Sequence, residues 1–172
     1  MSHQIEEQAF TELVDRHGPA VLGYLTRRVE VAADAADLLN DVLMTAWRRW
    51  DAVPTPPQDR PWLFGVARNV LANHHRSARR RDAATQALAQ ALRAVAANAP
   101  EPTPTVLDLR MAIQSLDPLD REILTLTAWE GLTSAEVATV VDLPSSTVRA
   151  RLARARAQVR AHITNDVDCA RT

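Results

Sequence analysis

The residues from 145 to 160 place five arginines around one helix in a pattern suited to binding DNA. This segment reads SSTVRARLARARAQVR, and at about 100° per residue its apolar side chains fall on one side of a helix. Arginines flank that apolar stripe in two rows, and small alanines form the opposite side. Such a helix can enter a major groove, where guanidinium groups reach phosphates and base edges. We therefore predict a recognition helix.

Each side of this predicted helix is defined by a few residues. The apolar stripe consists of Val148, Leu152, Ala155 and Val159, and the small front consists of Ala150, Ala153 and Ala157. One flank carries Arg149, Arg156 and Arg160, and the other carries Arg151 and Arg154. No acid interrupts these arginines, which favours a DNA-binding face over the alternative, an ordinary helical hairpin with a solvated basic face.

The preceding residues supply the first helix and the turn of a helix-turn-helix. Thr133 can cap a helix start, and Glu136 can reach back to it in a capping box. The triplet DLP at 142–144 has turn chemistry, and Ser145 can cap the second helix. Backbone N–H groups at that helix start favour phosphate near Ser146, Thr147 and Arg149. This order of elements predicts a helix-turn-helix.

A second row of residues in the N-terminal half could contact nucleic acid. On a helix starting near Pro61, one face carries Trp62, Asn69, Asn73, Arg76 and Arg80. Asparagine can pair with base edges, tryptophan can stack on an unpaired base, and arginine can hold the backbone, which together suit an opened strand. On this row alone, the alternative of a packed tryptophan and solvated polar residues has equal weight.

The charges are concentrated in a way that the total conceals. The net charge is −1, from 20 basic and 21 acidic residues. However, residues 67–81 and 149–160 each contain five arginines and no acid, and the rest of the chain is acidic. Charges act within a Debye length of about 8 Å, so local concentration matters more than the total. Two separate contacts with a polyanion are predicted.

Helical periodicity without strand alternation predicts an all-α protein with two small domains. In the second helix the expected apolar stripe consists of Leu39, Leu43, Ala46, Trp47 and Trp50. An alanine-rich stretch and the sequence PEPTPT separate the two halves. The predicted boundaries are a first domain at 1–81, a linker at 82–105, a second domain at 106–163 and a tail at 164–172.

The composition gives no sign of export, metal binding or catalysis. No leader pattern and no run of about 18 apolar residues is present, and the single cysteine, Cys169, fits a reducing cytoplasm. His74 and His75 are adjacent rather than at ligand spacing, and the four glycines form no phosphate-binding cluster. We expect no enzyme activity, no metal, no cofactor and no membrane insertion by its own signals.

Three segments in order resemble one known family. They read DAADLLNDVLMTAWRRW, PWLFGVARNVLANHHRSARRR and LDPLDREILTLTAWEGLTSAEVATVVDLPSSTVRARLARARAQVR. Over about residues 6–163 the chain resembles the extracytoplasmic-function group of bacterial RNA polymerase sigma factors. The resemblance implies a region 2-like and a region 4-like domain joined by a flexible linker, which bind the minus-10 and minus-35 promoter elements respectively.

The resemblance also implies a role for individual residues. Docking on the coiled-coil of the largest polymerase subunit is implied for Asp37, Leu38, Asn40 and Asp41 on the exposed side of the second helix. The polymerase flap is implied as a further contact of the protein. Contacts to the minus-10 element are implied for Trp62, Asn69, Asn73, Arg76, Arg79, Arg80 and Arg81. Contacts to the minus-35 element are implied for Ser146, Thr147, Arg149, Ala150, Arg151, Arg154 and Arg156.

The docking segment departs from the family pattern, and other functions stay open at this point. Ala36 stands where a second acid is usual, and Asn40, Asp41 and Val42 replace a common glutamine, glutamate and phenylalanine. The family usually has an anti-sigma factor as a further partner. A freestanding helix-turn-helix regulator is the alternative, although no dimerisation helix is evident. A nucleic-acid-processing enzyme is a weaker one.

Overall fold

Helices account for the regular structure of this chain. The structure, a computed structural model, describes the backbone of residues 2–93 and 104–169 and the side chains of residues 4, 6–78 and 109–163. Within those ranges there are seven α-helices, a short 3-10 helix and no strand, which confirms the all-α prediction. No described helix is long and apolar enough to cross a lipid bilayer. The chain divides into two compact units, Met1–Gln86 and Ala87–Thr172.

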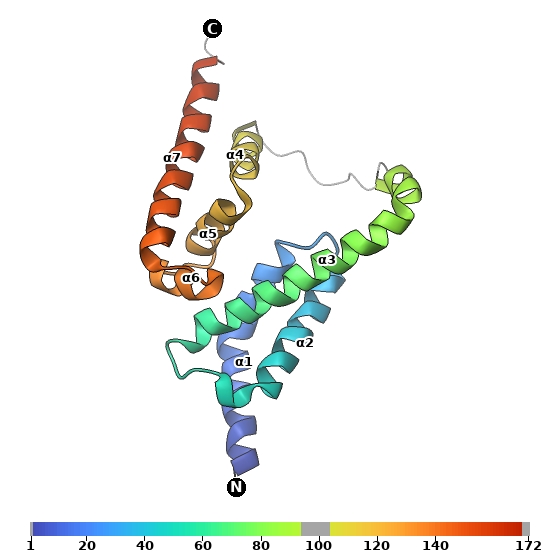
Figure 1. The fold of residues 1–172 in the computed structure, drawn as a ribbon, viewed down its shortest axis with the longest axis vertical. Helices are drawn as coiled ribbons and strands as arrows, with labels where there is room; N and C mark the ends of the chain where they lie inside the picture. Colours follow the sequence, from blue (N-terminus) through green and yellow to red (C-terminus); the bar gives the residue numbers. More distant parts are fainter. Residues whose placement is uncertain (1, 94–103, 170–172) are drawn as a thin grey trace. The chain divides into compact units, whose positions relative to one another are not determined.

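The first unit is built from three long helices. In chain order its elements are α1 (Ser2–Thr26), α2 (Ala32–Arg48), the 3-10 helix η1 (Trp50–Ala52) and α3 (Asp59–Arg93). Figure 1 shows α1 and α2 packed alongside each other, with α3 running across them. The rings of Tyr24 on α1 and Phe64 on α3 meet edge to face with centroids 5.5 Å apart, and both side chains are fully buried. Such aromatic pairs bury a large apolar area, so this contact forms the centre of the unit.

A buried carboxylate fixes the start of α3 against α1. Asp59 is 3% exposed, and its Oδ2 accepts a hydrogen bond from Arg16 Nη1 at 3.0 Å and lies 3.0 Å from His17 Nε2. Its Oδ1 accepts from the backbone N–H of Arg60. Because Asp59 is held on both oxygens, α3 begins there, two residues before the predicted start at Pro61.

The buried face of α2 differs from the predicted one. Leu39, Leu43, Trp47 and Trp50 were expected to be buried but are only half-buried, and the core face consists of Ala35, Leu38, Val42 and Ala46. Neighbouring residues on a helix point about 100° apart, so adjacent leucines belong to different faces. Leu38 is 5% exposed. Its predicted role as an exposed docking residue is therefore wrong.

The second unit packs three helices against one long helix. Its elements are α4 (Pro104–Gln114), α5 (Pro118–Ala128), α6 (Ser134–Val141) and α7 (Ser145–Cys169). In Figure 1, α4 and α5 lie along α7, and α6 lies across the N-terminal end of α7. The core is formed by fully or almost fully buried apolar residues, among them Leu116, Ile123, Leu126, Leu132, Val137, Val148, Leu152 and Ala155.

Helices extend into the segments predicted as linker and tail. α3 continues to Arg93 and α4 begins at Pro104, so both ends of the predicted linker at 82–105 are helical. Alanine has the highest helix propensity, and proline is well accommodated in the first turn of a helix. The final helix likewise continues to Cys169, well into the predicted tail. Residues 94–103 lie outside the described part of the chain.

Replacing Leu38 by alanine tests its corrected position. We expect Leu38→Ala to lower the free energy of unfolding of the first unit by about 2 to 5 kcal/mol, because it leaves a cavity in the core. Met44 on the same helix is 41% exposed, and we expect Met44→Ala to stay within about 0.5 kcal/mol of the parent. Urea unfolding followed by circular dichroism measures both values. Equal effects of the two substitutions would contradict the burial of Leu38.

Candidate nucleic-acid interface

The first helix of the predicted helix-turn-helix begins with a complete capping box. The backbone N–H of Thr133 donates to Glu136 Oε2 at 2.8 Å, and the backbone N–H of Glu136 donates to Thr133 Oγ1 at 3.3 Å. At the other end of α6, Asp142 adopts a left-handed conformation with φ of 55°. This residue turns the chain into α7. The capping box and the turn are both confirmed.

The final helix begins one residue earlier than predicted and shows the predicted faces. Ser145 is its first residue rather than its cap, and Ser145 Oγ accepts a 3.4 Å hydrogen bond from Arg149 Nη1. Burial of Val148, Leu152 and Ala155 confirms the apolar stripe, and Val159 is half-buried. The exposed residues on its other sides are Ser146, Arg149, Ala150, Ala153, Arg154, Arg156, Ala157, Gln158, Arg160 and Ala161, and Thr147 is half-buried.

The two arginines on the other flank of α7 are bound to a buried acid. Oδ1 of Asp120 on α5 accepts from Arg151 Nη1 at 2.6 Å. Its Oδ2 accepts from Nε and Nη2 of Arg154, at 3.1 and 2.7 Å. Asp120 is only 1% exposed, whereas the side chains of Arg151 and Arg154 are 31% and 56% exposed. The structure thus brings together two predicted DNA contacts and a third residue that the sequence analysis missed.

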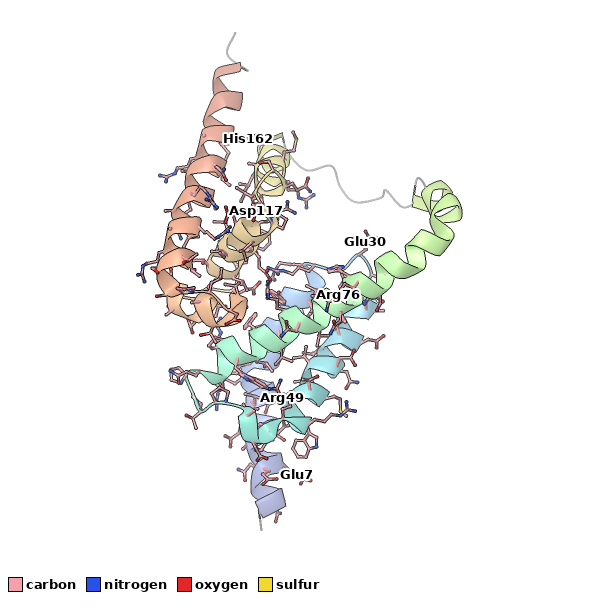
Figure 2. All side chains as sticks on the ribbon, viewed as in Figure 1. Glu7, Glu30, Arg49, Arg76, Asp117 and His162 are labelled. Carbon is pink, nitrogen blue, oxygen red and sulfur yellow. The ribbon has the colours of Figure 1, made fainter. Side chains whose placement is uncertain are left out.

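The arginines keep Asp120 ionised in spite of its burial. Burial raises the pKa of Asp120, but hydrogen bonds and charge from Arg154 and Arg151 lower it more, and the net result lies below the usual value. Asp117, labelled in Figure 2 at the start of α5, lies 3.7 Å from Arg151 as an additional exposed charge. The ion pairs join α5 and α7 and fix the rotation of α7 about its own axis.

A third arginine positions α5 relative to α4. Arg121 donates from Nε to the backbone carbonyl of Ile113 and from Nη2 to that of Leu116, each at 3.1 Å. The carbonyl of Ile113 is in the last turn of α4, and that of Leu116 is in the turn between α4 and α5. Since Asp120 is the residue before Arg121, this contact also sets where the buried carboxylate lies.

The candidate row on α3 is accessible over the part that the structure describes. Asn69, Asn73 and Arg76 are exposed, and Trp62 is half-buried. Arg76 projects from α3 (Figure 2), and its Nη2 donates to Asn73 Oδ1. No side chain is described for Arg79, Arg80 and Arg81, so those three predicted contacts lie outside the described residues. The exposed polar groups of this row are available to a ligand.

The predicted docking face on α2 is smaller than expected. Asp37, Asn40 and Asp41 are exposed and lie within one turn of each other, whereas Leu38 points into the core. Met44 follows Asp41 by three residues on the same side and is also exposed. The face therefore combines two carboxylates, an amide and one apolar side chain.

Comparison with known protein families accounts for most of the chain. Residues 13–81 match the family model described as Sigma-70 region 2. Residues 107–159 match the model described as Sigma-70, region 4. The first match contains the described row on α3 and the acidic face of α2, and the second contains the helix-turn-helix. Both candidate surfaces are thus in segments with family matches.

Individual relatives agree with the family models. The RNA polymerase sigma factor NccH of Alcaligenes xylosoxydans xylosoxydans is 32% identical over 92% of this chain and 88% of its own length. RfaY of Xanthomonas campestris pv. campestris is 30% identical over 94% of this chain, but this chain spans only 42% of that longer protein. The solved structure of CnrH in complex with the cytosolic domain of CnrY matches with a TM-score of 0.64 and 28% identity, over 93% of this chain and 90% of CnrH.

The lowered pKa of Asp120 predicts a pH-dependent contribution to stability. The contribution is complete above the unfolded pKa of about 4 and is lost as the pH falls through the folded value. We expect Asp120→Asn to cost the second unit about 1 to 3 kcal/mol at pH 7, because a buried charge-assisted contact is lost. This difference should shrink below about pH 4.

Urea unfolding of the two proteins at several pH values measures that difference. The matched control is Asp117→Asn, because Asp117 caps α5 by accepting from the backbone N–H of Leu119 and asparagine caps equally well. The control should stay close to the parent at every pH. An Asp120→Asn difference that is the same at pH 3 and pH 7 would contradict the ion-pair assignment.

Proposed function

Because this chain belongs to the extracytoplasmic-function group of sigma-70 family RNA polymerase sigma factors, we propose that it directs core RNA polymerase to a set of promoters. One observation carries this proposal: α7, the second helix of a complete helix-turn-helix, has an apolar back, a small front and arginine flanks. The region 2 match at 13–81 favours this role over a freestanding regulator, which needs no such segment.

In this role α7 enters the major groove of the minus-35 element. Arg149, Ala150 and Arg154 approach base edges, and their exposure leaves them accessible to DNA. Arg151 and Arg156 hold phosphates on either side. Ser146 and Thr147 add phosphate contacts at the helix N-terminus, where the backbone N–H groups favour anions.

The row on α3 takes the opened minus-10 strand. Asn69 and Asn73 pair with unstacked bases, and Trp62 offers a partly exposed ring for stacking. Arg76, followed by Arg79, Arg80 and Arg81, holds the strand backbone. The loop at 53–58, between η1 and α3, receives a base that is turned out of the stack. Arginines bind phosphate regardless of base, so sequence preference here comes from the asparagines.

The acidic face of α2 docks on the polymerase core. Asp37, Asn40 and Asp41 meet basic residues on the coiled-coil of the largest subunit, and the exposed Met44 adds an apolar contact. The second unit makes a further contact at the polymerase flap. The polymerase supplies the chemistry of transcription, so the proposed role needs no catalytic residue and no cofactor from this protein.

A protein inhibitor is the other proposed partner. The relative CnrH was solved in complex with the cytosolic domain of CnrY, and this chain matches CnrH over nearly its full length. We extend that arrangement to this chain and propose that a second protein, an anti-sigma factor, covers its polymerase-binding or DNA-binding surfaces. Binding at either surface would keep the protein from acting until the inhibitor is removed.

Transcription in vitro tests the proposed function directly. Core RNA polymerase alone should give no defined transcripts from fragmented genomic DNA of the source organism. Addition of the purified chain should produce transcripts that begin at discrete promoters sharing two spaced elements. If the chain stimulates no start site on any fragment, the proposal fails.

Asp41→Arg tests the docking face when the affinity of the chain for core RNA polymerase is measured by titration. Reversing this charge places a cation opposite basic residues, so we expect core-polymerase affinity to fall by at least about tenfold. DNA binding by α7 should be unchanged. Asp15→Arg on α1 makes the same charge change at another exposed position of the first unit, and it should leave core affinity near that of the parent. Equal affinities for Asp41→Arg and Asp15→Arg would contradict the docking assignment.

A further inference from the structure

We propose that Asp120, which is buried and touches no DNA, is a positioning residue that determines base preference at the minus-35 element by orienting Arg154. This inference rests on the proposed function. Asp120 belongs to α5, whereas Arg154 belongs to α7 and lies 34 residues away in the chain. The residue that sets promoter preference would therefore lie outside the helix that contacts the promoter.

The contact between these residues holds one defined edge of the guanidinium group. Both Nε and Nη2 of Arg154 donate to the same oxygen, Asp120 Oδ2, at 3.1 and 2.7 Å. This leaves both N–H groups of Nη1 and the second N–H of Nη2 for other acceptors. The side chain of Arg154 is 56% exposed despite the contact, so the site leaves room for a ligand beside it.

That remaining edge has the geometry that guanine requires. Two parallel N–H groups of a guanidinium can donate to O6 and N7 of guanine in the major groove, which is the commonest specific arginine contact with DNA. A freely rotating arginine would have to lose several rotamers on binding, whereas an arginine held by a buried acid has already lost them. The ion pair therefore pre-organises Arg154 for a base.

The second arginine keeps the carboxylate itself in place. Arg151 Nη1 binds the other oxygen, Asp120 Oδ1, at 2.6 Å, so the carboxylate is held on both sides and cannot turn about its own axis. The pKa of Asp120 lies below its usual value, because the two arginines favour the charged form of the acid. By contrast, Arg149 on the opposite flank makes a 3.4 Å contact with Ser145 of its own helix, which is too long to orient it firmly.

A promoter library measures the effect on base preference. The full-length chain, with core RNA polymerase, transcribes a pool of promoters whose minus-35 element is randomised, and sequencing of the transcripts gives the preference at each base pair. Asparagine is neutral and has only one accepting oxygen, so Asp120→Asn removes both ion pairs and weakens the contact that holds Arg154. We expect the preference at one base pair to fall about tenfold, with the other positions retained.

Two backgrounds separate a positioning role from a structural one. In the Arg154→Ala background, Asp120→Asn should cause no further change in preference, because the residue through which it acts is absent. In the Arg149→Ala background, Asp120→Asn should still lower the preference at the base pair that depends on Arg154. A further loss of the same size in the Arg154→Ala background would mean that Asp120 acts only on the fold, and would overturn the inference.

The outcomes also separate this inference from the proposed function. If the parent chain gives no transcript from any member of the pool, the proposed function fails. If the parent is selective and a folded Asp120→Asn protein has the same preferences, only the inference fails. Should Asp120→Asn not fold, Arg154→Lys replaces it, because lysine at this half-exposed site has no second nitrogen for a side-on contact. Unchanged preferences in Arg154→Lys would then overturn the inference.

Discussion

A buried carboxylate fixes the orientation of the helix that carries the proposed minus-35 contacts. Apolar packing of Val148, Leu152 and Ala155 attaches α7 to its unit, but hydrophobic contact has no preferred direction and tolerates rotation of a helix. The ion pairs of Asp120 with Arg151 and Arg154 are directional. An unpaired charge at this depth would be strongly destabilising, so α5 and α7 must pack in the one arrangement that satisfies it.

The first unit uses the same device for a different helix. Asp59, at the start of α3, is held by Arg16 and His17 of α1. There the basic partners belong to the scaffold, and the acid belongs to the helix with the candidate nucleic-acid row. In the second unit the arrangement is reversed, because the basic partners are on the helix with the proposed minus-35 contacts. Only this second arrangement places the buried acid in contact with side chains that are themselves proposed to meet DNA.

The sequence predicts features that depend on near neighbours better than those that depend on distant ones. The capping box of Thr133 and Glu136 and the faces of α7 follow from residues within a few turns, and both are confirmed. Leu38 was misplaced because α2 has adjacent leucines, and periodicity alone does not choose between them. Asp120 was overlooked because its partners lie 31 and 34 residues away. The available signal was its spacing: Asp120 lies three residues before buried Ile123 and thus on the same side of α5. An acid at such a core position requires a partner.

In the proposed role, Asp120 accounts for how a chain with net charge −1 selects its DNA sites. Exposed arginines such as Arg156 and Arg160 attract any phosphate backbone, which gives affinity without sequence preference. On the other flank the buried acid offsets part of the positive charge and restricts where Arg154 can point. The attraction of that flank for any phosphate is therefore weaker, while the direction in which Arg154 points is more closely defined. Selectivity in the proposed role therefore depends on how the cations of α7 are held, and the total number of basic residues matters less.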